Sequence, residues 1–191
     1  MSNKKVPMLN RHIRALSERL VQGEPLTHNM LSWAKQHVEW SLAEGDYTAH
    51  DGVLMLVIDV NGNAAMTVGE YEPLADTSAK ALRARSAEAR SEADETGVAP
   101  ELLAAVNNGE LAFVAPADEC LCGTATLIEQ LAQTKGIPVT RVDIPAQLKG
   151  ALFLVSDEHG VVPATDADAA ESDAATVAFF ADGYEKLRAR R

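Results

Sequence analysis

The chain has 191 residues and a formal net charge of −11, from 17 lysines and arginines against 28 aspartates and glutamates. Apolar residues make up 47% and charged residues 24%, which is typical of a globular domain with a core. The acidic balance argues against a nucleic-acid binder and against docking on anionic lipid, because both need a basic face. No apolar run approaches a membrane span and no signal-peptide pattern opens the chain, so we expect a cytoplasmic protein.

Two helices and a β-hairpin are predicted for the first third of the chain. Apolar residues at helical spacing predict a helix over 8–21, and Thr27 is a candidate N-cap for a second helix that Gly45 ends. The β-rich run GVLMLVIDV at 52–60 precedes the turn signal Asn61–Gly62, and the segment AAMTVGEYEPL is its predicted hairpin partner.

An alanine-rich helix is predicted from Asp76 to Gly97, where the composition changes abruptly. Its expected buried stripe is thin and consists of Ala79, Leu82, Ala87 and Ala93. Lys80 lies one turn inside this helix. If its small-residue surroundings desolvate the amine, Lys80 would be a nucleophile, whereas a solvated helix lysine is the simpler interpretation.

Strands and helices alternate in the second half, which predicts an α/β fold. The expected elements are strands at 110–116, 137–144 and 151–156, a helix at 123–135 and a closing helix that ends the chain. The acidic segment TDADAAESDAA at 165–175 has no large apolar side chain to bury. We therefore expect it to be a mobile surface loop.

Cys120 and Cys122 are separated by one residue, so a disulfide between them would be strained, and two thiols alone do not make a zinc site. The five histidines show no metal-binding spacing. We expect both cysteines to be packing residues, and we predict no metal site.

Two polar turns are candidate binding segments. The sequence C-G-T-A-T at 122–126 opens a helix whose N–H groups would bind an anion, although such helix starts are common without a ligand. The sequence S-D-E-H-G at 156–160 follows an apolar strand, where ligand groups of α/β proteins tend to lie. Ser156, Asp157 and His159 are candidate catalytic residues there, and an ordinary polar turn is the alternative.

The order of these features resembles the fold-type IV pyridoxal-phosphate (PLP) enzymes, that is, the class IV aminotransferases and aminodeoxychorismate lyases. The resemblance covers roughly 11–188 and is most specific across 109–165. It is carried by NNGELAFVAP, then CLCGT, a helix and GIPV, and then ALFLVSDEHGVVPAT. Upstream, RHIRALSERL is similar to the family's H-x-x-R-L helix, and the spacing from Lys80 to Gly97 is close to that after the family's Schiff-base lysine.

The resemblance implies an α/β, fold-type IV-like protein with a small N-terminal lobe over 1–75 and a larger C-terminal lobe over 76–191. It implies that Lys80 forms the aldimine with PLP. The other residues implied at the cofactor are Glu101 at the pyridine nitrogen and, at the phosphate, Gly123, Thr124, Ala125, Ser156 and Asp157.

The function implied is that of a PLP-dependent aminotransferase or an aminodeoxychorismate lyase-like enzyme acting on a small amino compound, as a homodimer. The chain is shorter than family members, and it has Thr126 where an arginine usually follows the first phosphate loop. The alternative is therefore a catalytically silent homologue retained as a dimerising or binding scaffold.

Overall fold

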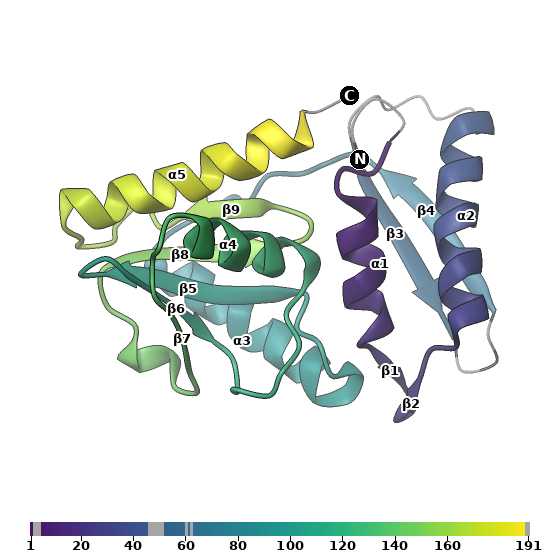
Figure 1. Ribbon diagram of the computed structural model, residues 1–191, viewed down its shortest axis with the longest axis horizontal. Helices are drawn as coiled ribbons and strands as arrows, with labels where there is room; N and C mark the ends of the chain where they lie inside the picture. The colour runs from purple at the N-terminus through teal and green to yellow at the C-terminus, as the bar shows by residue number, and fades with distance from the viewer. Residues whose placement is uncertain (2–4, 46–51, 60, 62, 190–191) are drawn as a thin grey trace.

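The structure is a computed structural model that describes residues 1, 5–45, 52–59, 61 and 63–189. Figure 1 shows two groups of elements side by side. The N-terminal group consists of α1 (Leu9–Ser17), β1 (Leu20–Val21), β2 (Glu24–Pro25), α2 (His28–Glu44), β3 (Val53–Ile58) and β4 (Ala64–Gly69). The predicted lobe boundary between residues 75 and 76 falls in the segment between β4 and the next helix, and it stays a prediction.

The C-terminal group is built around a five-stranded sheet with the strand order β7-β6-β5-β8-β9. Its elements are α3 (Ala79–Thr96), β5 (Glu101–Asn107), β6 (Glu110–Val114), α4 (Gly123–Thr134), β7 (Val139–Val142), the 3₁₀ helix η1 (Pro145–Gln147), β8 (Ala151–Ser156), β9 (Gly160–Pro163) and α5 (Glu171–Arg188). Only β6 and β7 pair in parallel, and α4 is the crossover between them. In Figure 1, α4 and α5 lie on one face of the sheet and α3 on the other.

Strand β5 is at the centre of the core. Its residues Leu102, Ala104 and Val106 belong to the cluster that includes α4 and α5 side chains, whereas Leu103 and Ala105 pack in a second cluster with Leu82 of α3. A strand buried on both faces reads as a continuous apolar run without alternation. Strand β8 is buried in the same way and was predicted, whereas β5 was missed because its leucines and alanines favour a helix as readily as a strand; the short strand β9 was also missed.

The helix predictions are confirmed, with shifted ends. Thr27 caps α2 by accepting a hydrogen bond from the Met30 N–H at 3.3 Å, and Gly45 follows its last residue. Helix α3 begins three residues later than expected, with Ser78 as its N-cap, and Gly97 ends it in the left-handed conformation at φ 80°. Helix α1 ends at Ser17, because the two apolar residues expected in its last turn form strand β1 instead.

Two further predictions concern the hairpin and the α3 stripe. Strands β3 and β4 pair antiparallel, which confirms the hairpin, although Gly62 of its turn lies outside the described residues. The buried residues of α3 are Leu82, Ser86, Ala89 and Ala93, so the expected stripe is half right.

The prediction of a loop at 165–175 is wrong from Glu171 onward, whereas 165–170 lie outside helices and strands; the expected mobility stays a prediction. Residues from Glu171 onward are the first turn of α5, where acidic side chains favour the positive end of the helix dipole. Asp173 is 3% exposed and accepts hydrogen bonds from the N–H groups of Asn108 at 2.9 Å and Gly109 at 3.0 Å. Asp166 accepts one from the Ala79 N–H at 2.6 Å. The carboxylates thus anchor this segment, although it has no large apolar residue.

None of the helices in the described part of the chain is both long and apolar enough to cross a bilayer.

Candidate functional site

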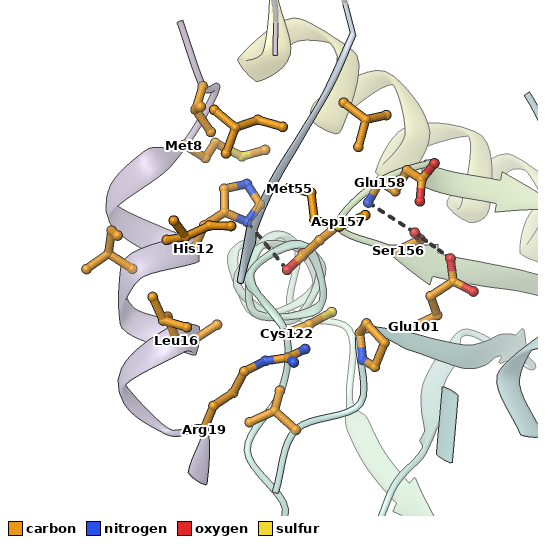
Figure 2. A pocket seen from close by; sticks show the side chains of 18 of the residues that line it. Met8, His12, Leu16, Arg19, Met55, Glu101, Cys122, Ser156, Asp157 and Glu158 are labelled. Carbon is orange, nitrogen blue, oxygen red and sulfur yellow. Dashed lines mark hydrogen bonds and ion pairs between the residues drawn. The ribbon is translucent and has the colours of Figure 1, made fainter. Parts of the chain in front are cut away.

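A cavity of about 900 Å³ is lined by residues of the N-terminal group and by the end of the five-stranded sheet at which β5 begins and β8 ends. Its apolar side consists of α1 and β3 residues, chiefly Met8, Ile13, Leu16, Met55 and Val57. Met55 and Val57 are 58% and 54% exposed, so this wall is not covered by other parts of the described chain. Figure 2 shows α1 facing the polar side across the cavity.

The polar side begins with Glu101, the first residue of β5, beside Ser156, the last residue of β8. The Ser156 hydroxyl donates to Glu101 Oε1 at 2.8 Å, and the guanidinium of Arg85 from α3 pairs with both carboxylate oxygens, at 2.5 and 3.0 Å. Ser156 Oγ also accepts from the N–H groups of Glu158 and His159, at 3.1 and 3.0 Å. Both predicted site residues therefore have several partners inside the protein.

His159 extends this network. Its Nε2 lies 3.0 Å from Arg85 Nη2, and its Nδ1 lies 3.3 Å from the hydroxyl of Tyr71. Because a guanidinium can only donate, Nε2 must accept, which leaves the ring proton on Nδ1. Burial lowers the pKa of His159, and the charge of Arg85 acts in the same direction, against the opposing effect of Glu158. The geometry and the pKa both indicate a neutral imidazole.

Asp157, in the turn after β8, lies beside the N-terminal end of α4. Its carboxylate accepts hydrogen bonds from the N–H groups of Thr124 at 2.7 Å and Gly123 at 3.3 Å, and His12 Nδ1 from α1 lies 3.4 Å from Oδ2. The N-cap residue of α4, Cys122, makes no side-chain capping bond, so Asp157 supplies the cap from a distant part of the chain. Figure 2 shows His12 and Asp157 joined beside Cys122.

The charge of Asp157 is stabilised by these contacts. Burial acts to raise its pKa, but the hydrogen bond and charge of His12 and the amide of Thr124 outweigh that effect, and the pKa is lowered. The backbone of Gly123 is also closely packed against this pair. A Cβ atom there would lie 2.8 Å from His12 Nδ1 and 3.4 Å from Asp157 Oδ1.

Both cysteines are free thiols, and Cys122 is buried in the core, as the packing interpretation predicted. Burial and then the charge of Asp157 raise the pKa of Cys122 well above its usual value. Among the described residues, no group of three or more histidine, cysteine or acidic side chains is placed to hold a metal ion.

The structure brings together five of the predicted cofactor residues, in one group of three and one pair. Gly123 and Thr124 meet Asp157, and Glu101 meets Ser156. Ala125 is buried within the first turn of α4. Lys80 is exposed in the first turn of α3 and does not line the cavity. Its role and the cofactor roles of the other residues stay predictions.

Sequence analysis missed three contributors to this site, His12, Arg85 and Tyr71. His12 was noted only as part of a family-like helix, and nothing in the local sequence shows that it faces the residue 145 positions later. Arg85 is one of several charged residues of an alanine-rich helix. It lies three residues after Leu82 and four before Ala89, both buried, and this helical spacing places it on the side of α3 that faces the sheet.

The comparisons with known proteins bear on the fold. No protein-family model and no curated protein sequence matches the chain. Among solved structures, the chain is similar to a fold IV-transaminase from Curtobacterium pusillum, with 17% identity, a TM-score of 0.55, and coverage of 96% of this chain and 80% of that one. A structure assigned as a 4-amino-4-deoxychorismate lyase matches with 16% identity, a TM-score of 0.48, and coverage of 85% and 86%.

This chain has a fold-type IV-like fold. The likeness to the transaminase confirms the predicted α/β fold class and the resemblance on which it was based. At this level of identity it establishes the fold alone, so the chemistry must be judged from the residues of the cavity.

Those residues do not fit PLP in the arrangement that the resemblance implies. The cofactor needs a lysine amine for its aldehyde and N–H donors or cations for its phosphate. No described residue lining the cavity is a lysine. The N–H groups of Gly123 and Thr124, which would bind the phosphate, already donate to a carboxylate.

Proposed function

We propose that this protein is a non-catalytic relative of the fold-type IV enzymes that binds a small molecule in the cavity beside α1. The observation that carries the proposal is the composition of the cavity wall, which is apolar along α1 and β3, polar at the ends of β5 and β8, and without a lysine among the described residues. This is one of the two functions that the sequence allows, the binding scaffold.

The size and chemistry of the cavity support binding. A volume of about 900 Å³ is within the range of small-molecule sites, which combine apolar walls with a few placed polar groups. The exposed Met55 and Val57 would lose contact with water when an apolar ligand binds. Arg85, Glu101 and Ser156 are held by one another, so the polar wall is preorganised.

A PLP-dependent aminotransferase or aminodeoxychorismate lyase-like enzyme is the second candidate, and the likeness to a transaminase favours it. The two candidates differ in one measurement. The purified chain is incubated with PLP, reduced with borohydride and analysed by peptide mass spectrometry. We expect no adduct confined to a single lysine. A pyridoxyl group on Lys80 alone would establish the PLP-dependent candidate, provided that it is lost in Lys80→Ala and kept in the matched surface variant Lys149→Ala.

Binding in the cavity is tested with Nile red, a neutral apolar dye. We expect its fluorescence to rise on mixing with the protein and to fall in Val57→Lys, which places a charge on the apolar wall. Ile144→Lys is the matched control, because Ile144 is 51% exposed but lies outside the cavity. Equal dye binding by both variants, or none by the wild type, would contradict the proposal.

Association as a homodimer is part of the same proposal. Trp33 and Trp40 of α2 are 43% and 59% exposed, which gives the N-terminal group an apolar outer surface. Light scattering at micromolar concentration should report twice the mass of the chain. A clean monomer would remove the dimer from the proposal and leave the binding site in place.

A further inference from the structure

The start of α4 is an anion site whose occupant belongs to the chain itself. Two consecutive amides, at Gly123 and Thr124, converge on the carboxylate of Asp157 at 3.3 and 2.7 Å. A helix start attracts negative charge through its free N–H groups and its dipole. These are also the amides that the family resemblance assigns to a phosphate group.

The space around these amides is also filled. The imidazole of His12 approaches Gly123 so closely that a Cβ there would be 2.8 Å from Nδ1, and the same nitrogen lies 3.4 Å from Asp157 Oδ2. A phosphate is larger than a carboxylate. It would have to displace both the Asp157 side chain and the His12 ring.

The remaining charges of the cavity wall do not compensate a dianion. Among the described lining residues, five carry carboxylates, Glu88, Glu92, Glu101, Asp157 and Glu158, and three carry guanidiniums, Arg19, Arg85 and Arg188. Met1 also lines the cavity, and its N-terminal ammonium donates to the carbonyl oxygen of Gly52. Each guanidinium is already paired with a carboxylate. Arg19 pairs with Glu92 at 2.7 Å, Arg85 with Glu101, and Arg188 with Glu185 outside the wall. A phosphate would therefore meet a surplus of negative charge.

We propose that Asp157 is an intramolecular substitute for a phosphate group, so that the cavity rejects phosphate-bearing cofactors and accepts neutral or cationic ligands. The ligand class rests on the proposed binding function, whereas the occupation of the anion site does not. Asp157 is thus the residue that determines which ligands are excluded.

The test follows the backbone amide signals of Gly123 and Thr124 by NMR while inorganic phosphate is added at constant ionic strength. The wild type should show no saturable change at these signals at millimolar phosphate. In Asp157→Ala, the vacated amides should bind phosphate, with a Kd lower than the wild-type value by about tenfold or more.

Asp166→Ala is the matched control, because Asp166 also accepts a bond from a helix-start N–H, that of Ala79, but outside the cavity. The Gly123 and Thr124 signals should not respond to phosphate in this variant. If Asp157→Ala does not fold, Asp157→Ser takes its place, because serine removes the charge and shortens the side chain while keeping a polar group in the turn. Its phosphate affinity should also exceed that of the wild type.

Phosphate binding to these amides in the wild type would overturn the inference, as would its absence in a folded Asp157→Ala or Asp157→Ser. The same phosphate response in Asp166→Ala would overturn it too. None of these outcomes depends on the Nile red result. If the dye does not bind but the Asp157 variants gain phosphate affinity, the proposed function fails and the inference on the anion site stands.

Discussion

Helices α3 and α4 begin in different ways. At α3 the N-cap residue makes its own capping bond: Ser78 accepts from the Ala81 N–H at 3.2 Å, and Asp76 accepts from the Ser78 N–H at 2.8 Å. The distant Asp166 adds one bond, from the Ala79 N–H at 2.6 Å. At α4 the N-cap residue is a cysteine that makes no capping bond, and the carboxylate comes from Asp157, 33 residues beyond Thr124. A local cap stabilises one helix. A distant cap also fixes how the turn after β8 and helix α4 are placed relative to each other.

The largest expected effect on stability is that of removing Asp173, a buried carboxylate that accepts hydrogen bonds from backbone N–H groups far away in the sequence. Asp173→Ala would leave the amides of Asn108 and Gly109 in the β5–β6 turn without their acceptor, and should lower the free energy of unfolding by about 3 kcal/mol. Urea unfolding measures it. Asp182→Ala, at an exposed position of the same helix, is the control and should change stability by less than about 0.5 kcal/mol. Similar losses in both would mean that charge on α5, rather than the turn contact, matters.

Asp157→Ala should be next, lowering the free energy of unfolding by about 2 kcal/mol, because two amides and His12 lose one shared partner. The loss should be accompanied by faster hydrogen exchange at Thr124. Asp157→Asn, which keeps an acceptor oxygen, should lose less. A loss in Asp157→Ala no greater than in Asp157→Asn would show that the acceptor oxygen retained by Asn adds no stability and that only the charge matters.

Ser78→Ala sharpens the comparison at the local cap. Its expected cost is about 1 kcal/mol, because one hydrogen bond at the start of α3 is lost while Asp76 and Asp166 keep theirs. Urea unfolding of Ser78→Ala beside Ser91→Ala, an exposed position of the same helix, isolates the cap from helix propensity. A cost equal to that of Asp157→Ala would remove the distinction between the two helix starts.

The smallest expected effect is the change of the free energy of unfolding with pH. The lowered pKa of Asp157 means that the folded state holds its charged form more tightly than the unfolded state does, where the pKa is near 3.8. This stabilisation is present above pH 3.8 and is lost as the pH falls through the folded-state pKa. The stability difference between wild type and Asp157→Asn should therefore shrink under acid conditions. If the stability difference between the wild type and Asp157→Asn stays constant from neutral to acid pH, the difference comes from side-chain shape rather than from charge.

Elements with strong local signals were predictable. Thr27 and Gly97 mark helix ends through contacts within a few residues, and the β-rich run before the turn signal Asn61–Gly62 predicted the β3–β4 hairpin. The order of the motifs across 109–165 predicted the fold-type IV-like arrangement. Strand β5 was not recognised, because its leucines and alanines favour a helix as readily as a strand, whereas the equally buried β8 was predicted.

The sequence by itself determined the fold class, most helix and strand positions, and the two polar turns that come together. Only the tertiary structure decided what those turns do: Asp157 closes on the α4 amides, Lys80 points to solvent, and Arg85 neutralises Glu101. The physical reason is the range of the interactions. Propensity and capping act over one helical turn, whereas the partner of a carboxylate depends on which distant amide or guanidinium the folded chain places beside it.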